Sequence, residues 1–483
     1  MMATKKPAKG PSTLQLIVAR LRKVSAEKEG NGIIEAACSS DSILSEVKYV
    51  LKTDNSPWDD MTGAFPIGRV VEIFGLEASG KTALMLTTAY QATKGEVYKR
   101  IRVDDRGNEY KYERLDPDTY EVSVVYIDNE HSLDDTGIIE VNGETMDIVV
   151  TRCETVEGIF KTIDETISEL QKVEERTQKM QFLLVVVDTI AGTATKEELG
   201  QAWDKDDYSR RPKQLQEGFR NLIQSISRHN VLVICTNQVG DQIGYQAPKG
   251  PKSNSPDWRA YSPPGGKALK FWSTLRVFMW QCSNNYKLVK DDKFQAGIMV
   301  GFKTVKNRML APFREGRMVI LFDRNGKGGL RPDFSLLESL IYFKLVEEDD
   351  DRNLIFKLKS NGVQPTTFPE LMAILATAPA ESSEDAPVDK ADKGKKKDRY
   401  KDPRITCRAA FPKFYIDHKA DIDALWAIAV EQSRTIGGID GEPVATETEP
   451  EAEGEGTTTE EQPNEDAPRR RRGGRNPLVD LKV

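Results

Sequence analysis

Short apolar runs alternate along the chain with longer segments in which apolar residues recur at helical spacing. The runs that predict strands are 70–74, 122–127, 182–187, 231–236 and 297–306, and the segments that predict helices are 83–90, 156–180, 213–228 and 332–345. Residues 182–187 are apolar at every position, as in a strand covered on both faces. This alternation predicts an α/β fold with a mainly parallel, twisted sheet and helices on both faces.

Other patterns flank and interrupt this core. Residues 12–28 carry apolar side chains at helical spacing, so we expect an amphipathic helix that docks on another surface. Residues 101–120 alternate polar and aromatic side chains around Gly107, which predicts an inserted β-hairpin. Residues 369–376 predict a further short helix, whereas 378–404 mix Ala, Ser, Asp and Lys without apolar periodicity and predict a flexible linker.

Composition narrows the class of protein. The chain has 483 residues, of which 38% are hydrophobic and 30% charged, which is typical of globular units with polar appendages. No apolar run approaches the roughly 20 residues of a membrane helix, and the basic start lacks the apolar stretch of a secretory signal. We therefore expect a cytoplasmic protein without a membrane partner. The net charge of -7 argues against a uniformly basic DNA-binding surface, but the acidic residues are concentrated in the tail.

The cysteines favour buried reduced thiols over a disulfide frame or a metal site. They are widely spaced, have no CxxC pairing and lie mostly among apolar residues. The five positions are Cys38, Cys153, Cys235, Cys282 and Cys407.

One glycine-rich segment predicts a phosphate site. Residues 75–82 fit the pattern G-x-x-x-x-G-K-[ST] between a predicted strand and a predicted helix. The glycines let backbone N–H groups turn toward phosphate oxygens, and the helix N-terminus adds partial positive charge. Lys81 supplies a cation for the β- and γ-phosphates, and Thr82 supplies a hydroxyl ligand for Mg²⁺. The expected ATP-binding residues of this loop are Gly75, Leu76, Glu77, Ala78, Ser79, Gly80, Lys81 and Thr82.

Carboxylates follow two other predicted strands. Asp188 ends the run 182–187, where the carboxyl edge of a parallel sheet lets it hold the metal through water. Glu130 is our candidate general base, which would activate the water that attacks the γ-phosphate. Asp128 supports either Glu130 or the metal, because acids at i and i+2 of a strand point the same way. The alternative for this pair of acids is an exposed acidic turn.

Four separated segments resemble those of bacterial RecA-type recombinases, in the same order along the chain. Residues 68–82 resemble that family's entry into the phosphate loop, and 127–134 resemble its catalytic-glutamate strand. The resemblance implies a RecA-like ATPase core in which Glu130 is the base, Asp134 contacts adenine and Gln238 senses the γ-phosphate. With Lys81, Glu130 and Gln238 form the expected catalytic set.

The other two segments imply contacts between subunits. Residues 265–271 are similar to the family's segment whose phenylalanine, here Phe271 beside Lys270, packs on the neighbouring protomer. Lys306 and Arg308 resemble the family's two lysines that reach ATP on the adjacent protomer. Arg308 departs from that pattern by replacing a lysine, which keeps the charge and adds a planar fork suited to bidentate phosphate contact. Gly137 stands where the family has an adenine-stacking aromatic residue, so we expect the base to be held differently.

Two loops combine basic, aromatic and flexible residues in the way that single-stranded DNA-binding segments do. The resemblance places the family's two apolar wedges at Tyr208 and Ile243. A solvated polar loop with chance aromatic residues is the alternative for each. The candidate DNA-binding residues are Tyr208, Arg210, Arg211, Lys213 and Arg220 in and after the first loop, and Ile243, Tyr245, Lys249, Lys252, Trp258, Arg259 and Lys267 in the second.

These features predict a DNA-dependent ATPase that forms a helical homo-oligomeric filament on single-stranded DNA and exchanges strands with double-stranded DNA in recombination and repair. Two other functions remain open: an ATP-binding filament or regulatory paralogue with little strand exchange, and a hexameric helicase motor. The acidic tail either competes with DNA for basic surface or serves solubility. The expected units are an N-terminal helical oligomerisation element at 1–60, the ATPase and DNA-binding core at 61–330, a C-terminal extension of the core at 331–377, a flexible linker at 378–404, a small helical segment at 405–437 and a disordered acidic tail with a basic end at 438–483.

Overall fold

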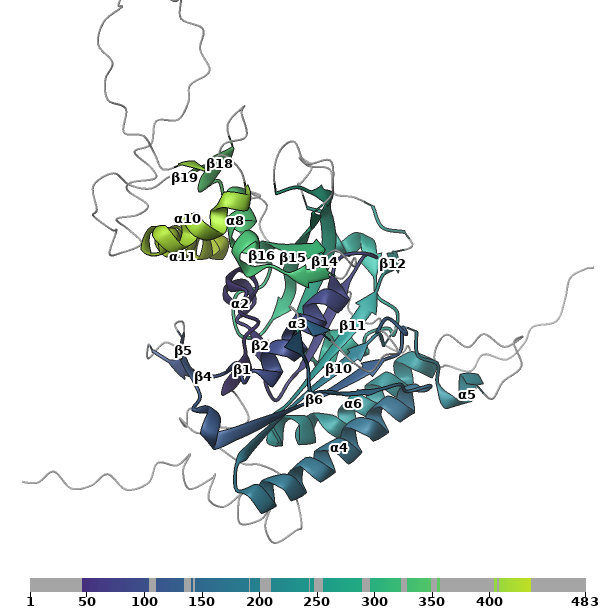
Figure 1. Ribbon diagram of the computed structural model, residues 1–483. Helices are drawn as coiled ribbons and strands as arrows, with labels where there is room; N and C mark the ends of the chain where they lie inside the picture. Colours follow the sequence, from purple (N-terminus) through teal and green to yellow (C-terminus); the bar gives the residue numbers. More distant parts are fainter. Residues whose placement is uncertain are drawn as a thin grey trace, which may run out of the picture. The chain divides into compact units, whose positions relative to one another are not determined.

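The fold is described by a computed structural model, shown in Figure 1. The described residues are 46–103, 110–133, 140–141, 144–190, 192–199, 210–242, 244–246, 255–288, 296–322, 328–348, 354–356, 404–405 and 408–435. All of them belong to the first of two units, residues 1–439, and the second unit is residues 440–483.

A nine-stranded sheet lies at the centre of the described residues, in the order β17-β16-β15-β14-β3-β11-β10-β6-β9. In chain order these strands are β3 (Val70–Gly75), β6 (Tyr120–Asp128), β9 (Val149–Thr151), β10 (Met180–Asp188), β11 (Val231–Gln238), β14 (Ser273–Tyr286), β15 (Gly297–Asn307), β16 (Glu315–Phe322) and β17 (Gly328–Leu330). Neighbours from β14 to β9 are parallel, and β15, β16 and β17 extend the sheet antiparallel. The predicted mainly parallel α/β fold is confirmed.

Helices cover both faces of this sheet (Figure 1). They are α3 (Lys81–Thr93) and α8 (Pro332–Tyr342) on one face, and α4 (Val156–Thr177), α6 (Arg210–Arg228) and α7 (Ala268–Trp272) on the other. Alternate residues of one strand serve the two cores, because successive side chains point to opposite faces. In β10, Leu184 packs with the core of α3, whereas Leu183 and Val185 pack with that of α4 and α6.

The predicted hairpin is present in a second sheet, of order β2-β1-β4-β5. Its strands are β1 (Tyr49–Leu51), β2 (Phe65–Pro66), β4 (Val97–Arg102) and β5 (Tyr110–Arg114), and α2 (Ser56–Thr62) lies between β1 and β2 in the chain. The ladder of β4 and β5 runs from the pair Tyr98 and Arg114 to the pair Arg102 and Tyr110. The hairpin therefore begins before the predicted start at Ile101.

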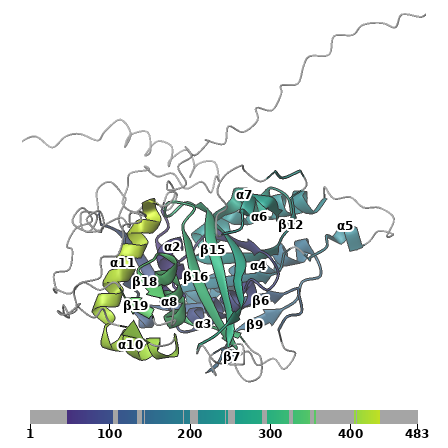
Figure 2. The ribbon, with the colours of Figure 1, turned by 90° about the horizontal axis from the view of Figure 1, so that it is seen from above.

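The C-terminal helices α10 (Phe411–Asp417) and α11 (Lys419–Thr435) pack beside α8, as Figure 2 shows. Trp426 of α11 lies 6.4 Å from the ring of Phe343, and its indole N–H donates to Asp60 at 2.7 Å. These helices thus share the core of the sheet. The smaller elements are β7 (Glu140–Val141), β8 (Glu144–Thr145), α5 (Lys196–Leu199), β12 (Gly240–Asp241), β13 (Tyr261–Ser262), β18 (Val346–Glu348), β19 (Leu354–Phe356) and β20 (Arg404–Ile405).

The thiol prediction holds for one described cysteine and is wrong for another. Cys153, Cys235 and Cys282 are free, but only Cys235 is buried and Cys282 is exposed. Cys282 lies in the part of β14 where side chains alternate between the core and solvent. The predicted helices at 12–28 and 369–376 lie outside the described residues, as does the tail 438–483. No helix of the described part is long and apolar enough to span a membrane.

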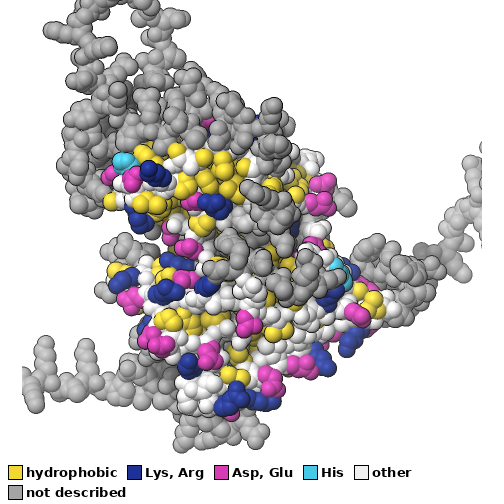
Figure 3. Space-filling model, in the orientation of Figure 1, with side chains coloured by type: hydrophobic (Ala, Val, Ile, Leu, Met, Phe, Trp, Pro, Cys, Tyr) yellow, Lys and Arg dark blue, Asp and Glu magenta, His cyan; other side chains and the backbone are white. Residues whose placement is uncertain are grey.

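Acidic and basic side chains are interspersed on the face shown in Figure 3. The outer side of α4 carries acidic and basic side chains that pair with each other. Lys161 pairs with Glu165 at 3.5 Å, and Lys172 pairs with Glu169 at 2.6 Å. A helix surface of this kind is a solvated face and offers no continuous basic track for a phosphate backbone.

The buried carboxyl of Asp59 in α2 generates a prediction about stability. It accepts bonds from the N–H of Thr53 at 3.0 and 3.1 Å, yet burial raises its pKa from 3.8 to about 8. The folded chain therefore binds one more proton than the unfolded chain between those values, so this group lowers the free energy of unfolding as pH rises through that window. Asp59→Asn should give a shallower decline, measured by chemical denaturation from about pH 5 to 8, the window of that titration. Exposed Asp118→Asn is the control, and equal slopes for Asp59→Asn and wild type would contradict the assignment.

Candidate nucleotide site and interface cations

The phosphate loop, residues 75–82, connects β3 to α3. Gly75 must be glycine, because a Cβ there would lie 2.0 Å from the carbonyl oxygen of Met279 in β14. Gly80 is the N-cap of α3 with φ of 80°, in the left-handed region that favours glycine. Both glycines of the motif thus meet local backbone requirements, and the first turn of α3 directs its free N–H groups into the loop.

Lys81 lies folded over this loop. Its ammonium donates to the carbonyl oxygens of Gly75 at 3.1 Å and Leu76 at 2.8 Å. Burial lowers the pKa of Lys81, and the nearby carboxylates of Glu130 and Asp188 oppose that shift. A triphosphate in the loop would supply the strong anionic partner that this partly desolvated cation lacks.

Asp188 is the centre of a buried cluster of hydroxyl groups. Its carboxylate accepts from Thr82 Oγ1 at 2.9 Å, from the Tyr126 hydroxyl at 2.7 Å and from Thr236 Oγ1. β3, β6, β10 and β11 all end at this edge, so the parallel register gathers their polar ends. Tyr126 and Thr236 were not predicted; their only signal is a polar group near the end of a buried strand.

The pair Thr82 and Asp188 fits Mg²⁺ that arrives with a nucleotide. Mg²⁺ prefers oxygen ligands and is commonly held by one or two carboxylates together with substrate phosphates and water. The described residues contain no group of three or more His, Cys, Asp or Glu side chains arranged to hold a metal. The two oxygens here therefore suit a shared metal site completed by phosphate, and do not form a closed site of their own.

Glu130 faces Gln238 across the carboxyl edge. The Gln238 amide donates to Glu130 Oε1, and the backbone N–H of Glu130 donates to the Asp188 carbonyl at 3.3 Å. Burial and the carboxylate of Asp188 raise the pKa of Glu130. A carboxylate with a raised pKa, exposed toward the loop, has the properties of a general base. The geometry joins Glu130, Gln238, Lys81 and Asp188 at one edge.

The i, i+2 expectation for Asp128 and Glu130 does not apply, although Asp128 stands opposite Asp188 in the sheet. β6 ends at Asp128, so Glu130 lies beyond the strand and the alternation of side chains no longer applies. Asp128 is fully buried and accepts from the backbone N–H groups of Ser132 at 3.0 Å and Leu133 at 3.2 Å. It holds the turn that follows Glu130.

Lys306 and Arg308 lie at the opposite edge of the sheet. Lys306 stands opposite Arg276 in β14, which stands opposite Glu72, near the start of β3. Glu72 precedes Gly75 by three residues, about 10 Å along a strand, so Lys306 is displaced toward the amino edge by that length. Its ammonium donates to the carbonyl oxygens of Lys270 at 2.7 Å and Phe271 at 3.1 Å, at the end of α7.

Several cations lie close together here, and we call Arg69, Lys270, Lys306 and Arg308 the amino-edge cations. Burial lowers the pKa of Lys306 to about 8, with a further contribution from Arg308. Burial also lowers the pKa of Arg69, and Arg308 contributes again. The carboxylate of Glu72 opposes the shift at Lys306. The side chain of Phe271 is 56% exposed beside this patch, so an apolar and a cationic surface adjoin.

The second DNA-binding candidate loop is anchored at its base by β12 and β13, which pair antiparallel. Trp258 is half-buried and packs against the cluster of Phe74 and Phe278, as does Tyr261, whose ring centroid lies 5.5 Å from that of Phe278. Trp258 thus fixes the loop base and is only partly accessible for stacking.

Other loop residues have partners within the chain. Asp257 accepts from the Tyr245 hydroxyl and forms an ion pair with Arg259 at 2.9 Å. Lys267 is exposed at the start of α7. Lys267 therefore places a positive charge at the start of α7, the helix that also carries the exposed ring of Phe271.

The basic start of α6 is partly neutralised. Arg210 pairs with Glu197 at 3.3 Å and Arg211 with Glu198 at 3.2 Å, both acids lying in α5. Lys213 and Arg220 are exposed on the side of α6 away from its buried residues Leu215 and Phe219. The predicted site residues Asp134, Tyr208, Ile243, Lys249 and Lys252 lie outside the described residues.

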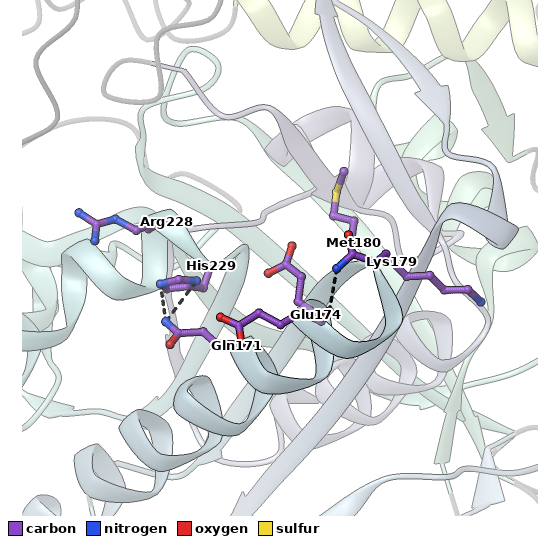
Figure 4. A pocket seen from close by; sticks show the side chains of 8 residues that line it. Gln171, Glu174, Lys179, Met180, Arg228 and His229 are labelled. Atoms are coloured by element: carbon purple, nitrogen blue, oxygen red, sulfur yellow. Dashed lines mark hydrogen bonds between the residues drawn. The ribbon is translucent and has the colours of Figure 1, made fainter.

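A separate cavity of about 670 Å³ lies at the ends of α4 and α6 (Figure 4). Gln171 and His229 contact each other at its wall, with a nitrogen–nitrogen distance of 2.7 Å. The cavity adjoins the amino ends of β10 and β11, so it shares no residue with the phosphate loop. It is lined by Gln171, Glu174, Glu175, Gln178, Lys179, Met180, Arg228 and His229.

Comparisons with known proteins all point to one family. The family described as the RecA N-terminal domain matches residues 118–327. Protein RecA of Thermus aquaticus is 27% identical over 286 residues, which cover 59% of this chain and 69% of that protein. Protein RecA of Malacoplasma penetrans is 25% identical over 286 residues and 71% of its length. The family match begins after the phosphate loop and the β4–β5 hairpin. The assignment of the loop as a phosphate site therefore depends on its own motif and geometry.

The position of Lys81 predicts a specific loss on substitution. Lys81→Ala should reduce the affinity for Mg²⁺ and ATP by tenfold or more, because the loop loses the cation nearest the β- and γ-phosphates, on the order of 1.4 kcal/mol per factor of ten. Titration with a fluorescent ATP analogue measures this. Lys94→Ala, at the C-cap of the same helix, should bind as wild type does. Equal affinities for Lys81→Ala and Lys94→Ala would exclude the loop as the phosphate site.

Proposed function

We propose that this chain, whose residues 118–327 match the RecA N-terminal domain, is an ATP-dependent recombinase that forms helical filaments on single-stranded DNA and pairs that strand with homologous double-stranded DNA. In this proposal ATP lies between neighbouring protomers, and DNA stimulates its hydrolysis. The product is an exchanged strand, as recombination and repair require.

One observation carries the proposal: the phosphate loop and the amino-edge cations lie at opposite edges of the same sheet. β15 holds Lys306, and the turn after it holds Arg308, toward the amino edge and away from Lys81 of the same protomer. A second copy that stacks head to tail brings the amino edge of one protomer onto the carboxyl edge of the next. Head-to-tail contacts of this kind generate open helical filaments when the rotation does not close.

The chemistry at the carboxyl edge follows from the residues gathered there. Mg²⁺, when bound, would neutralise charge that develops on the γ-phosphate. Lys81 would neutralise the same phosphates, and Thr82 and Asp188 would hold the metal. Glu130 would accept a proton from the attacking water, and Gln238 orients Glu130 through their hydrogen bond.

DNA binding is proposed for the loops beyond β11 and before α6. Gln238 ends β11 and is followed directly by β12, so the residue that contacts Glu130 is continuous with the base of the second loop. This continuity supports a link between nucleotide state and DNA grip. We propose that a phosphate backbone competes with the α5 acids for Arg210 and Arg211.

A strand-exchange assay tests the proposed function. Protein, ATP and Mg²⁺ are incubated with a circular single strand and a labelled homologous duplex, and transfer of the labelled strand is the expected result. ATP-dependent filaments without transfer would favour a regulatory paralogue. Unwinding that needs no homology would favour a helicase motor.

The shared site predicts rescue between two inactive variants. Arg308→Ala should leave the ATP affinity of isolated protomers unchanged and should lower DNA-stimulated turnover by about 10³-fold, the lower end for a cation supplied in trans. Mixing it with Lys81→Ala should restore part of the hydrolysis, because a mixed junction joins an intact phosphate loop to intact cations. No recovery, with co-assembly shown by crosslinking, would contradict the shared site.

The pKa of Lys306 predicts a pH dependence of assembly. Burial lowers it to about 8, so in the isolated protomer the charge is lost as pH rises through this value. A phosphate partner favours the charged form, so assembly with ATP would take up a proton above that pH and weaken as pH rises. Light scattering between about pH 7 and 9, a range that brackets this titration, should show this for wild type. Lys306→Arg stays charged and should give a flatter profile. An equally steep decline in wild type and Lys306→Arg would show that a group other than Lys306 titrates.

A further inference from the structure

The turn that carries the amino-edge cations is held at several points. Asn307 stands between Lys306 and Arg308, and its side-chain oxygen accepts from the backbone N–H groups of Met309 at 2.8 Å and Leu310 at 3.1 Å. Its amide donates to the carbonyl oxygen of Thr62, at the end of α2, at 2.8 Å. The backbone N–H of Arg308 donates to the Thr274 carbonyl at 3.1 Å. These contacts define the turn, residues 307–310.

The inserted β4–β5 hairpin contributes a further contact. Arg100 of β4 donates from Nη2 to the carbonyl oxygen of Met309 at 3.0 Å. Its guanidinium lies 3.2 Å from the ring centroid of Tyr110 in β5, and the residue is only 7% exposed. Burying a guanidinium costs free energy that its contacts must offset. The contacts with Met309 and Tyr110 therefore hold the Arg100 side chain in one position.

Aromatic packing joins the hairpin to the same turn. Tyr98 and Tyr112 pack against a small cluster that includes Met309 and Leu310. Lys52 adds a cation over both tyrosine rings, at 4.7 Å from Tyr98 and 5.0 Å from Tyr112. One face of the hairpin thus covers the turn with an apolar and cation–π layer.

The other face of the hairpin has no such role in the described residues. Lys99 and Lys111 are exposed there, and Lys111 pairs with Glu113 at 3.0 Å at the surface. The two faces alternate along β4, so Lys99 and Arg100 are neighbours in sequence that point in opposite directions. The hairpin is specialised on the side that contacts the turn.

We infer that the β4–β5 hairpin is a positioning element for the cations supplied in trans, with Arg100 as its key positioning residue. The inference rests on the proposed function, because it assigns the hairpin to the same shared site. The single hydrogen bond to Met309 lies one residue beyond Arg308, so its loss lets the turn shift relative to β15. A displacement of about 1 Å at a catalytic group can lower a rate by up to about a hundredfold.

The test compares Arg100→Met with Lys99→Met in the full-length protein. Arg100→Met keeps the apolar stem and loses the donor, and we expect DNA-stimulated kcat to fall by about tenfold or more, within the range for misplaced groups. The KM for ATP in assembled protein and the affinity of protomers for the fluorescent ATP analogue should stay the same. Arg100→Lys keeps one donor and should recover part of the rate. Lys99→Met should match wild type.

Mixing experiments locate the defect. Arg100→Met mixed with Lys81→Ala should regain hydrolysis, because the second protein supplies well-positioned cations. Arg100→Met mixed with Arg308→Ala should not, because every junction then lacks them. Rescue in the second mixture, or wild-type kcat for Arg100→Met, would overturn the hairpin inference. Failure of Arg308→Ala and Lys81→Ala to rescue each other would instead overturn the proposed function.

A folding defect is separated by a second variant. Tyr110→Leu removes the ring beneath Arg100 and leaves the Arg100 donor in place. It therefore weakens the hydrogen bond to Met309 without removing a fully buried side chain. Its kcat should fall less than that of Arg100→Met, with thermal unfolding equal to that of Lys99→Met. If Arg100→Met unfolds early, a wild-type kcat for Tyr110→Leu and for Arg100→Lys counts against the inference.

Discussion

The common direction of the strands from β14 to β9 is the constraint on which the site depends. Because these neighbours are parallel, β3, β6, β10 and β11 end at one edge, and each end brings a polar group to it. The loop at Gly75, the carboxylates of Asp188 and Glu130, and the amide of Gln238 meet for this reason. The antiparallel strand β15 carries Lys306 back to the other edge. One change of strand direction thus separates the two halves of the proposed shared site.

Burial gives this edge its chemical properties. Asp188 is 1% exposed, and the hydroxyls of Thr82, Tyr126 and Thr236 supply the hydrogen bonds that a buried carboxylate requires. Asp188 in turn acts on its surroundings, because its charge raises the pKa of Glu130 and opposes the loss of charge at Lys81. The same carboxylate therefore links the proposed metal site, the base and the loop cation.

A buried ion pair links neighbouring strands of the central sheet. Glu72 of β3 accepts from Arg276 of β14 and, at 3.2 Å, from the amide of Asn237 in β11. That amide also donates to the carbonyl oxygen of Pro264, at the close of the second loop. Removing one partner of such a network leaves a buried charge unpaired, so the three strands keep a fixed register. Through Glu72, Asn237 of β11 is thereby linked to Arg276 of β14, the residue that stands opposite Lys306.

The amino-acid sequence by itself determined the periodicities and the local chemistry. Strand and helix periods predicted the parallel sheet, and the spacing of glycines before Lys81 and Thr82 predicted the phosphate loop, because both are properties of neighbouring residues. Tertiary structure decided which distant groups meet. Only the register of β6 and β10 brings Tyr126 to Asp188, and only the end of β6 at Asp128 takes Glu130 out of the strand alternation. The hairpin could be predicted from its alternation, but its contact with Met309 could not, since a hydrogen bond across 209 positions leaves no pattern in either segment.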